Sequence, residues 1–240
     1  MYNNPAKFQQ RTPEQIDDEI TYLKKNYNIG GINLRDEVCL PVNKEEAFRQ
    51  LEVIGRHNIL WRGQTVPFGP EEVVKRARES GCVELSIGME TVESDQMLKN
   101  INKPYQSVER GRQYVELLKK YGIKVKVCLI FGLPGETRQV LKKTIDFLET
   151  TKPDYVALSG FDPVPGSTFS SRKEEYGIRM LTEDLSRHAH LLYRFGDEEE
   201  VGLPFEYEPS AVSAEPLSRK EIIENIRQLQ SYLRSNNMCY

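Results

Sequence analysis

The feature that most constrains the fold is a repeated alternation of amphipathic helical segments with short apolar segments typical of strands. Strands are predicted at residues 30–34, 58–62, 82–87, 123–131 and 155–158. Helices are predicted at residues 13–27, 44–54, 70–80, 108–121 and 139–148. Such alternation favours parallel strands joined by right-handed crossovers, and the apolar strands favour a sheet buried on both faces. The pattern predicts an α/β fold, either a doubly wound sheet or a barrel.

The alternation fades after Phe169, and the rest of the chain is more polar. A helical stretch is expected at 182–193, a solvated acidic run at 197–200 and irregular structure at 204–216. Ser218 is expected to cap a final amphipathic helix at 219–233. We therefore predict two parts, residues 1–172 and a C-terminal extension, 173–240, that packs on the first part.

Composition excludes several classes of function. The net charge is −3, which argues against nucleic acid as a partner, and no apolar run is long enough to span a bilayer. The start of the chain has no secretory signal, so a cytoplasmic protein is expected. The four cysteines are far apart, which indicates buried or incidental thiols rather than a zinc site, a cluster loop or disulfides. No nucleophile–base pattern stands out, so catalytic residues are not predicted.

Glycine, proline and acidic residues gather just after the predicted strands. They include Asp36 and Glu37, Gly88 and Glu90, and the segments 132–136 and 162–166. Parallel α/β proteins place ligand sites at this edge of the sheet, although tight turns use the same residue types. The pattern alone is compatible with a ligand site and with plain turns.

Six segments in the same order resemble the radical S-adenosylmethionine (SAM) superfamily, especially its cobalamin-associated branch. They are RTPEQIDDEI, GGINLRDE, ILWRGQT, GCVELSIGMETVES, GIKVKVCLIFGLPGET and DPVPGSTF, spread over residues 8–170. The resemblance implies a partial (β/α) barrel that lacks the family's first strand, with a helical C-terminal extension. It also implies SAM across the C-terminal ends of the strands, a 4Fe-4S cluster held by a CxxxCxxC loop, and radical chemistry on a small-molecule substrate. Cobalamin is possible in the parent protein.

The resemblance also implies which residues contact SAM. Asp36 and Glu37 would lie near its methionine end, and Gly88 and Glu90 near its ribose or amino group. Residues that would approach the adenine are Ile130, Gly132, Pro134, Gly135, Pro163, Pro165 and Gly166. For each group a structural role is the alternative: a solvated acid pair, a salt bridge, a turn or a stiffened loop.

The sequence departs from the family because it contains no CxxxCxxC motif. The chain is therefore expected to be inactive alone, and no metal ligand is predicted. Three explanations stay open: a fragment of a longer enzyme, a cluster-free relative that binds small ligands, or one subunit of a split enzyme. In the last case a partner chain would supply the first strand and the cysteines. The parent reaction would be reductive SAM cleavage, followed by cobalamin-dependent methyl transfer or a rearrangement.

Overall fold

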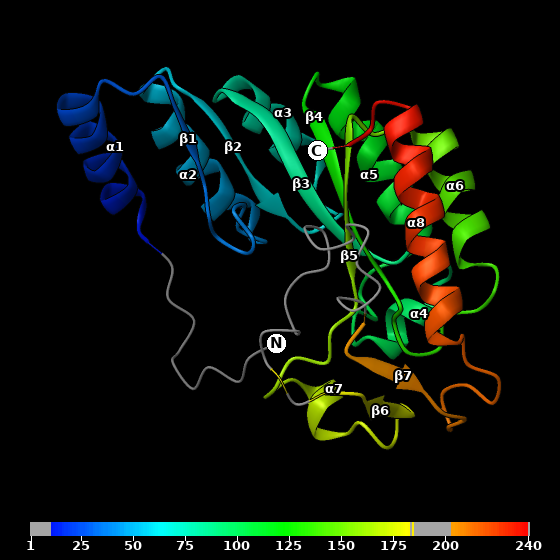
Figure 1. The fold of residues 1–240 in the computed structure, drawn as a ribbon. Helices are drawn as coiled ribbons and strands as arrows, with labels where there is room; N and C mark the ends of the chain where they lie inside the picture. Colours follow the sequence, from blue (N-terminus) through cyan, green and yellow to red (C-terminus); the bar gives the residue numbers. More distant parts are fainter. Residues whose placement is uncertain (1–10, 183, 185–202, 240) are drawn as a thin grey trace. The chain divides into compact units, whose positions relative to one another are not determined.

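The computed structural model describes residues 11–182, 184 and 203–239. Its main sheet has five strands: β1 (Gly31–Asn33), β2 (Leu60–Thr65), β3 (Cys82–Glu90), β4 (Lys124–Phe131) and β5 (Tyr155–Gly160). The spatial order of the strands follows the chain, and β2 pairs in parallel with both β1 and β3 (Figure 1). A doubly wound sheet begins in the middle and reverses direction, so this order identifies the predicted α/β partial barrel.

The chain divides into two compact units, which are described separately. The first, called the β2 unit, contains residues 6–89 and 109–127, and the second, called the β5 unit, contains residues 90–108 and everything from 128 onward. Strand β4 contributes residues to both units. The predicted division at residue 172 concerns a different boundary and stays a prediction.

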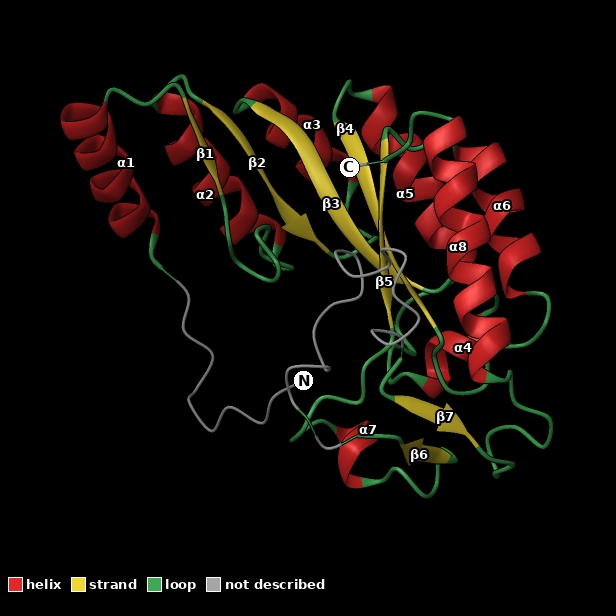
Figure 2. Cartoon of the chain, in the orientation of Figure 1, coloured by secondary structure: helices red, strands yellow, loops and turns green. Residues whose placement is uncertain are grey.

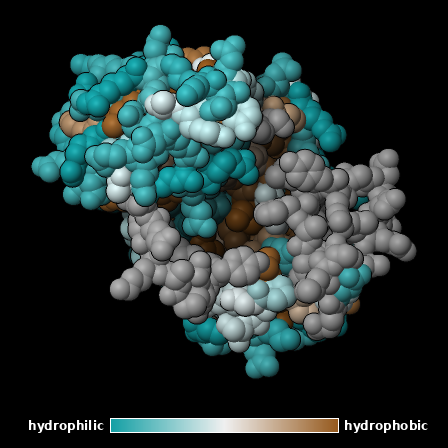
Figure 3. Space-filling view, turned by 90° about the vertical axis from the view of Figure 1, so that its left-hand side faces the viewer, coloured by the Kyte–Doolittle hydropathy of each residue, from teal (hydrophilic) through white to brown (hydrophobic). Residues whose placement is uncertain are grey.

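The helices of the β2 unit are α1 (Pro13–Tyr27), α2 (Lys44–Arg56), α3 (Glu71–Glu79) and α5 (Val108–Lys120). Side-chain caps start the first two of them. Thr12 and Gln15 form a capping box at α1, and the Asn43 side chain accepts the N–H groups of Glu45 and Glu46 at α2. Among the described side chains of α1, only Ile20 is buried, and the surface over α1 is mostly hydrophilic (Figure 3).

Strand β2 is buried on one face. Trp61, Gly63 and Thr65 are buried, whereas the alternating positions Leu60, Arg62 and Gln64 are exposed. The expectation of a sheet buried on both faces is therefore wrong for β2, although β3 is buried along most of its length. The strand also lies later in the chain than predicted, because Asn58 adopts a left-handed turn conformation with φ 51° before it.

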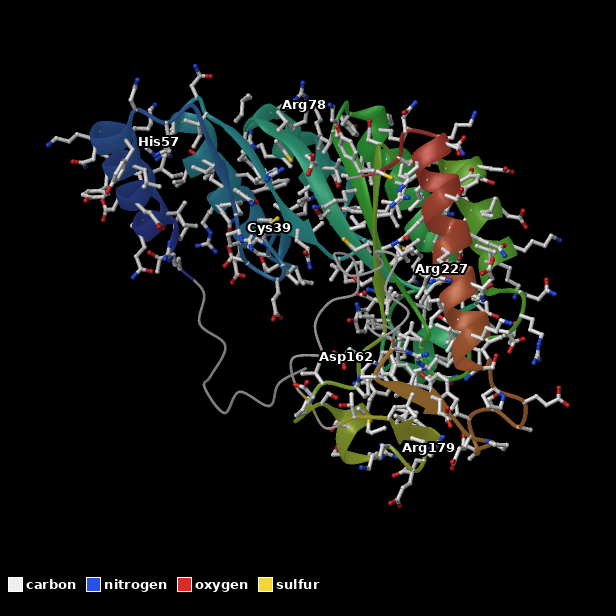
Figure 4. All side chains as sticks on the ribbon, viewed as in Figure 1. Cys39, His57, Arg78, Asp162, Arg179 and Arg227 are labelled. Atoms are coloured by element: carbon white, nitrogen blue, oxygen red, sulfur yellow. The ribbon has the colours of Figure 1, made fainter. Side chains whose placement is uncertain are left out.

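The core of the β2 unit contains the single tryptophan. Trp61 is 1% exposed, and its indole nitrogen donates a 3.0 Å hydrogen bond to Ser80 Oγ. Trp61 is therefore a core residue. His57 follows the last residue of α2, and its Nε2 atom lies 2.8 Å from Asp17 Oδ1 of α1 (Figure 4). This contact joins the two helices.

The β5 unit combines helices with a small two-stranded sheet (Figure 2). Its further elements are α4 (Asp95–Asn100), α6 (Val140–Thr151), α7 (Thr168–Ser171), β6 (Ile178–Met180), β7 (Phe205–Tyr207) and α8 (Arg219–Ser235). Strands β6 and β7 pair antiparallel, so the prediction of irregular structure at 204–216 is wrong for β7. The stretches predicted at 182–193 and 197–200 lie outside the described residues, apart from 182 and 184.

Helix α8 closes the β5 unit. A capping box of Ser218 and Glu221 starts it, as the sequence predicts for Ser218. Glu221 also accepts a 2.9 Å hydrogen bond from Arg138, just before α6, and the residues after α8 pair with β5 through Val156. Across the described residues, no helix combines the length and apolar character needed to cross a membrane.

We predict that Gly63→Ala lowers the free energy of unfolding by about 2 kcal/mol, because it overpacks the core. A Cβ at Gly63 would lie 2.6 Å from Cys39 Sγ and 2.9 Å from Cys39 Cβ. Urea titration measures the loss, and Cys39→Ala in the same chain should recover part of it. Gly30→Ala is the matched control, since nothing lies within 4 Å of its added Cβ. Equal stability of the two glycine variants would contradict the packing.

Candidate functional site

The turn that follows β4 is held in place by its own buried contacts. Gly132 has φ 86° and Gly135 φ 90°, a left-handed region that favours glycine. The Gly132 N–H donates a 2.8 Å hydrogen bond to Glu136 Oε2, and its carbonyl accepts a 2.7 Å hydrogen bond from the Tyr207 hydroxyl. A Cβ at Gly132 would lie 2.9 Å from Ile222 Cγ2 of α8. Packing against α8 therefore requires glycine here whether or not a ligand binds.

Glu136 is the most perturbed acid of this region. It is 4% exposed, and burial raises its pKa to about 8 in spite of hydrogen bonds from the backbone of Gly132 and Leu133. The nearby Glu93 also raises this pKa. Its Oε1 atom has no hydrogen-bond partner among the described residues. The group is therefore mostly neutral at pH 7, which lowers the cost of burying it.

A second acid joins the loop after β3 to the loop after β4. Glu93 is 5% exposed and accepts hydrogen bonds from both the backbone N–H and the hydroxyl of Thr137, the latter at 2.5 Å. Two neighbouring strands thus end in loops that are tied to each other inside the β5 unit. This link restricts how far either loop can move when a ligand approaches.

Glu90 ends β3 in a strained conformation. Its φ is 62°, an uncommon left-handed value for a residue with a side chain, and strain of this kind often marks functional sites. Lys103 Nζ donates a 2.5 Å hydrogen bond to Glu90 Oε1. Both side chains are mostly buried, with 21% of the Glu90 side chain and 23% of the Lys103 side chain exposed. The salt bridge that the sequence left open as an alternative is therefore present. The other carboxylate oxygen keeps its capacity to accept a hydrogen bond.

The remaining predicted residues of the β5 unit differ in burial. Ile130 is half-buried on β4, and Pro134 is buried in the turn after it. In the loop after β5, Pro163 is buried, whereas Pro165 and Gly166 are exposed. The Phe161 N–H donates a 2.7 Å hydrogen bond to the Phe131 carbonyl, which joins the end of β5 to the end of β4. The predicted adenine contacts thus lie at adjacent strand ends, and their role in binding stays a prediction.

The β2 unit holds the other predicted residues. Asp36 and Glu37 are exposed in the loop after β1, and Gly88 is half-buried on β3. Cys39, which follows the acid pair, donates its N–H to the Gln64 carbonyl at 2.7 Å, so the loop is anchored to the end of β2 (Figure 4). The anchored loop leaves both carboxylates exposed, and their role in binding stays a prediction.

The described cysteines do not fit an iron–sulfur cluster, whose ligands are thiolates. Burial raises the pKa of Cys39 to about 12 and raises the pKa of Cys82 even further, so both stay protonated at neutral pH. Cys128 is half-buried and Cys239 is exposed. Within the described part of the chain, no three His, Cys, Asp or Glu side chains are grouped to hold a metal ion.

Comparison with known proteins establishes the family. The model of the radical SAM superfamily matches residues 2–148, more than half of the chain. The chain belongs to the radical SAM superfamily. This superfamily uses SAM together with a 4Fe-4S cluster, as the resemblance of the sequence segments had indicated.

Similar proteins perform several reactions. An anaerobic magnesium-protoporphyrin IX monomethyl ester cyclase of Rubrivivax gelatinosus is 27% identical over 184 residues, 74% of this chain and 32% of that protein. An uncharacterised methyltransferase of Pyrococcus horikoshii is 30% identical over 171 residues, 69% of this chain and 35% of that protein. This chain thus spans about a third of the length of these relatives, so their activities do not transfer to it directly.

Solved structures confirm the fold. The radical SAM methyltransferase TsrM from Kitasatospora setae, with tryptophan and a SAM analogue bound, superposes with a TM-score of 0.66 and 17% identity. The match covers 92% of this chain and 46% of TsrM. Another structure of the same enzyme contains cobalamin and a 4Fe-4S cluster. At this identity the likeness shows the fold alone.

Sequence analysis missed the residues that support this region. Glu93, Glu136 and Thr137 stand inside the matching segments, but nothing in those segments signals that the two acids are buried. Lys103 and Tyr207 reach the region from distant parts of the chain, so no local pattern could have found them.

We predict that the raised pKa of Glu136 makes stability depend on pH. The folded chain keeps this proton up to about pH 8, whereas the unfolded chain releases it near the ordinary pKa of 4.5. The contribution of Glu136 to the free energy of unfolding is therefore fully present below pH 4.5 and is lost as pH rises to about 8. Urea titrations across this window should show the decline, and Glu136→Gln should flatten it. The exposed-acid control Glu79→Gln should retain the decline, and a slope unchanged by Glu136→Gln would refute the assignment.

Proposed function

We propose that this chain supplies the SAM-binding strand ends of a radical SAM enzyme that acts on a small-molecule substrate. The parent reaction is reductive SAM cleavage followed by radical chemistry, either cobalamin-dependent methyl transfer or a rearrangement. Family membership supports the use of SAM. The names of the relatives, a porphyrin ester cyclase and methyltransferases, support modification of an organic small molecule.

The observation that carries the proposal is the Glu90 carboxylate at the end of β3. Lys103 holds one of its oxygens, and the half-buried environment strengthens any further hydrogen bond to the carboxylate. SAM carries a ribose diol and an ammonium group, both of which donate hydrogen bonds. The remaining carboxylate oxygen therefore fits either donor group, because a charge-assisted bond is stronger than a neutral one.

The turn after β4 fits the adenine end for a different reason. Its backbone is fixed by Glu136 and Tyr207, so it needs no reorganisation when a flat apolar group approaches. Ile130 offers an apolar side chain on the half-buried face of β4. In this account Glu90 would orient SAM, while Ile130 and the turn would seat its base. SAM would supply the radical chemistry of the superfamily once a reduced 4Fe-4S cluster, held by ligands other than these cysteines, delivers one electron.

A cluster-free function is the second candidate, favoured by the protonated, buried state of Cys39 and Cys82. In that case the chain by itself binds a small nucleoside-like ligand at the same strand ends. As one subunit of a split enzyme whose partner supplies the cysteines, the chain would instead serve the first function. Both candidates require the Glu90 region, and they differ in whether iron takes part.

We predict that SAM binds the purified chain and that Glu90→Gln weakens binding about 10-fold to 100-fold, because a charge-assisted hydrogen bond is lost. Isothermal titration calorimetry measures the affinity, and thermal melts establish that the variant folds. Glu79→Gln, on the exposed surface of α3, is the matched control and should bind like the unsubstituted chain. A folded Glu90→Gln variant with unchanged affinity would remove Glu90 from the site.

We also predict that the four cysteines of this chain do not assemble a cluster by themselves. After anaerobic reconstitution with iron and sulfide, followed by desalting, iron should stay far below four atoms per chain and no brown chromophore should appear. Near-stoichiometric iron retained by the chain, and lost in Cys39→Ala or Cys82→Ala, would contradict the assignment of these thiols as protonated core residues.

A further inference from the structure

The β2 unit contains a pocket that lies outside the predicted SAM contacts. It opens at the C-terminal end of β2 and is bounded by the loop after β1 and the start of α3. The hollow measures about 370 Å³ including its open mouth. Because part of this volume is open to solvent, a small ring or a short branched chain would enter it with one end still at the mouth.

The walls of this pocket carry no charge. Its apolar side chains include Leu40, Val66, Phe68 and Val73. An anion or cation placed here would lose its hydration without gaining a counter-ion, which costs several kcal/mol. The pocket therefore selects against phosphates, carboxylates and amines.

Two hydroxyl groups interrupt the apolar wall. Thr65 and Tyr114 both line the pocket, and each is only 4% exposed. Neither hydroxyl oxygen is among the buried side-chain atoms that lack a hydrogen-bond partner in the described part of the chain, so neither is sealed inside the protein as an unsatisfied group. A ligand oxygen that enters the pocket can therefore take the place of water at these hydroxyls.

The tyrosine is positioned for this role by its surroundings. A Cβ on Gly69, at the pocket wall, would lie 3.6 Å from both the Tyr114 hydroxyl and its ring edge, so the hydroxyl lies beside a residue that has no side chain. Burial raises the pKa of Tyr114 well above its ordinary value, and the hydroxyl stays a hydrogen-bond donor at neutral pH.

We propose that this pocket binds the uncharged, mostly apolar end of a small molecule that carries one hydroxyl or carbonyl oxygen. The oxygen is held by Tyr114 and Thr65, and the apolar part packs on Val66 and Phe68. The proposal does not depend on SAM binding, because the pocket is complete within the β2 unit.

Three probes test the proposal on the full chain. Phenol has a ring and one oxygen, benzene lacks the oxygen, and benzoate carries a charge. Amide shifts of Val66, Phe68 and Gly69, followed by two-dimensional NMR, should saturate with phenol and benzene. Phenol should bind about 2-fold to 10-fold more tightly than benzene, the effect of one net hydrogen bond. Benzoate should leave these amides unshifted at the same concentrations.

Variants separate the hydroxyls from the apolar walls. Tyr114→Phe should remove the preference for phenol over benzene with little change in the thermal midpoint, since it keeps the buried ring and removes only the hydroxyl. Tyr22→Phe, an exposed tyrosine of α1, is the matched control and should keep the preference. Gly69→Val should block both probes by filling the pocket. Benzoate binding as tightly as phenol, an absence of saturable shifts at these amides, or an unchanged preference in Tyr114→Phe would overturn the proposal.

Discussion

The β5 unit depends on one buried hydrogen bond, from the Gly132 N–H to the Glu136 carboxyl. This bond closes the turn after β4, and the Tyr207 hydroxyl donates a second hydrogen bond to the Gly132 carbonyl. Helix α8 fills the space where a side chain at Gly132 would stand. The turn is therefore rigid before any ligand arrives, which lowers the ordering cost of binding. Rigidity is achieved with a buried acid that is neutral at physiological pH.

Local patterns predicted the order of the main elements, because the signals for helix caps and apolar strands lie within a few consecutive residues. Ser218 caps the helix expected of it, Thr12 caps the helix predicted from residue 13, and glycine follows β4 at Gly132 as a turn requires. The short helix α4 was missed, although Ser94 before Asp95 is a usable capping signal. The burial of β2 on one face was also missed, because composition does not reveal which face the helices cover.

The candidate site was predictable only in part, since its supporting contacts join residues that are distant in sequence. The resemblance pointed to Glu90 and Gly132, but it could not reveal that Lys103 neutralises the first or that Ile222 packs on the second. A ligand role and a structural role are not exclusive at such positions. A salt bridge that uses one carboxylate oxygen leaves the other for a ligand, and a turn packed against a helix is a firm platform for a base.

The central claim is that SAM binds at the ends of β3 and β4, on the Glu90 carboxylate and the rigid turn. Hydrogen–deuterium exchange followed by mass spectrometry tests it most directly, because it locates a ligand without relying on a substitution. With saturating SAM, peptides covering 88–93 and 128–137 should exchange more slowly, while α1 stays unchanged. If SAM binds but slows exchange elsewhere and leaves these two segments unaffected, the account is wrong.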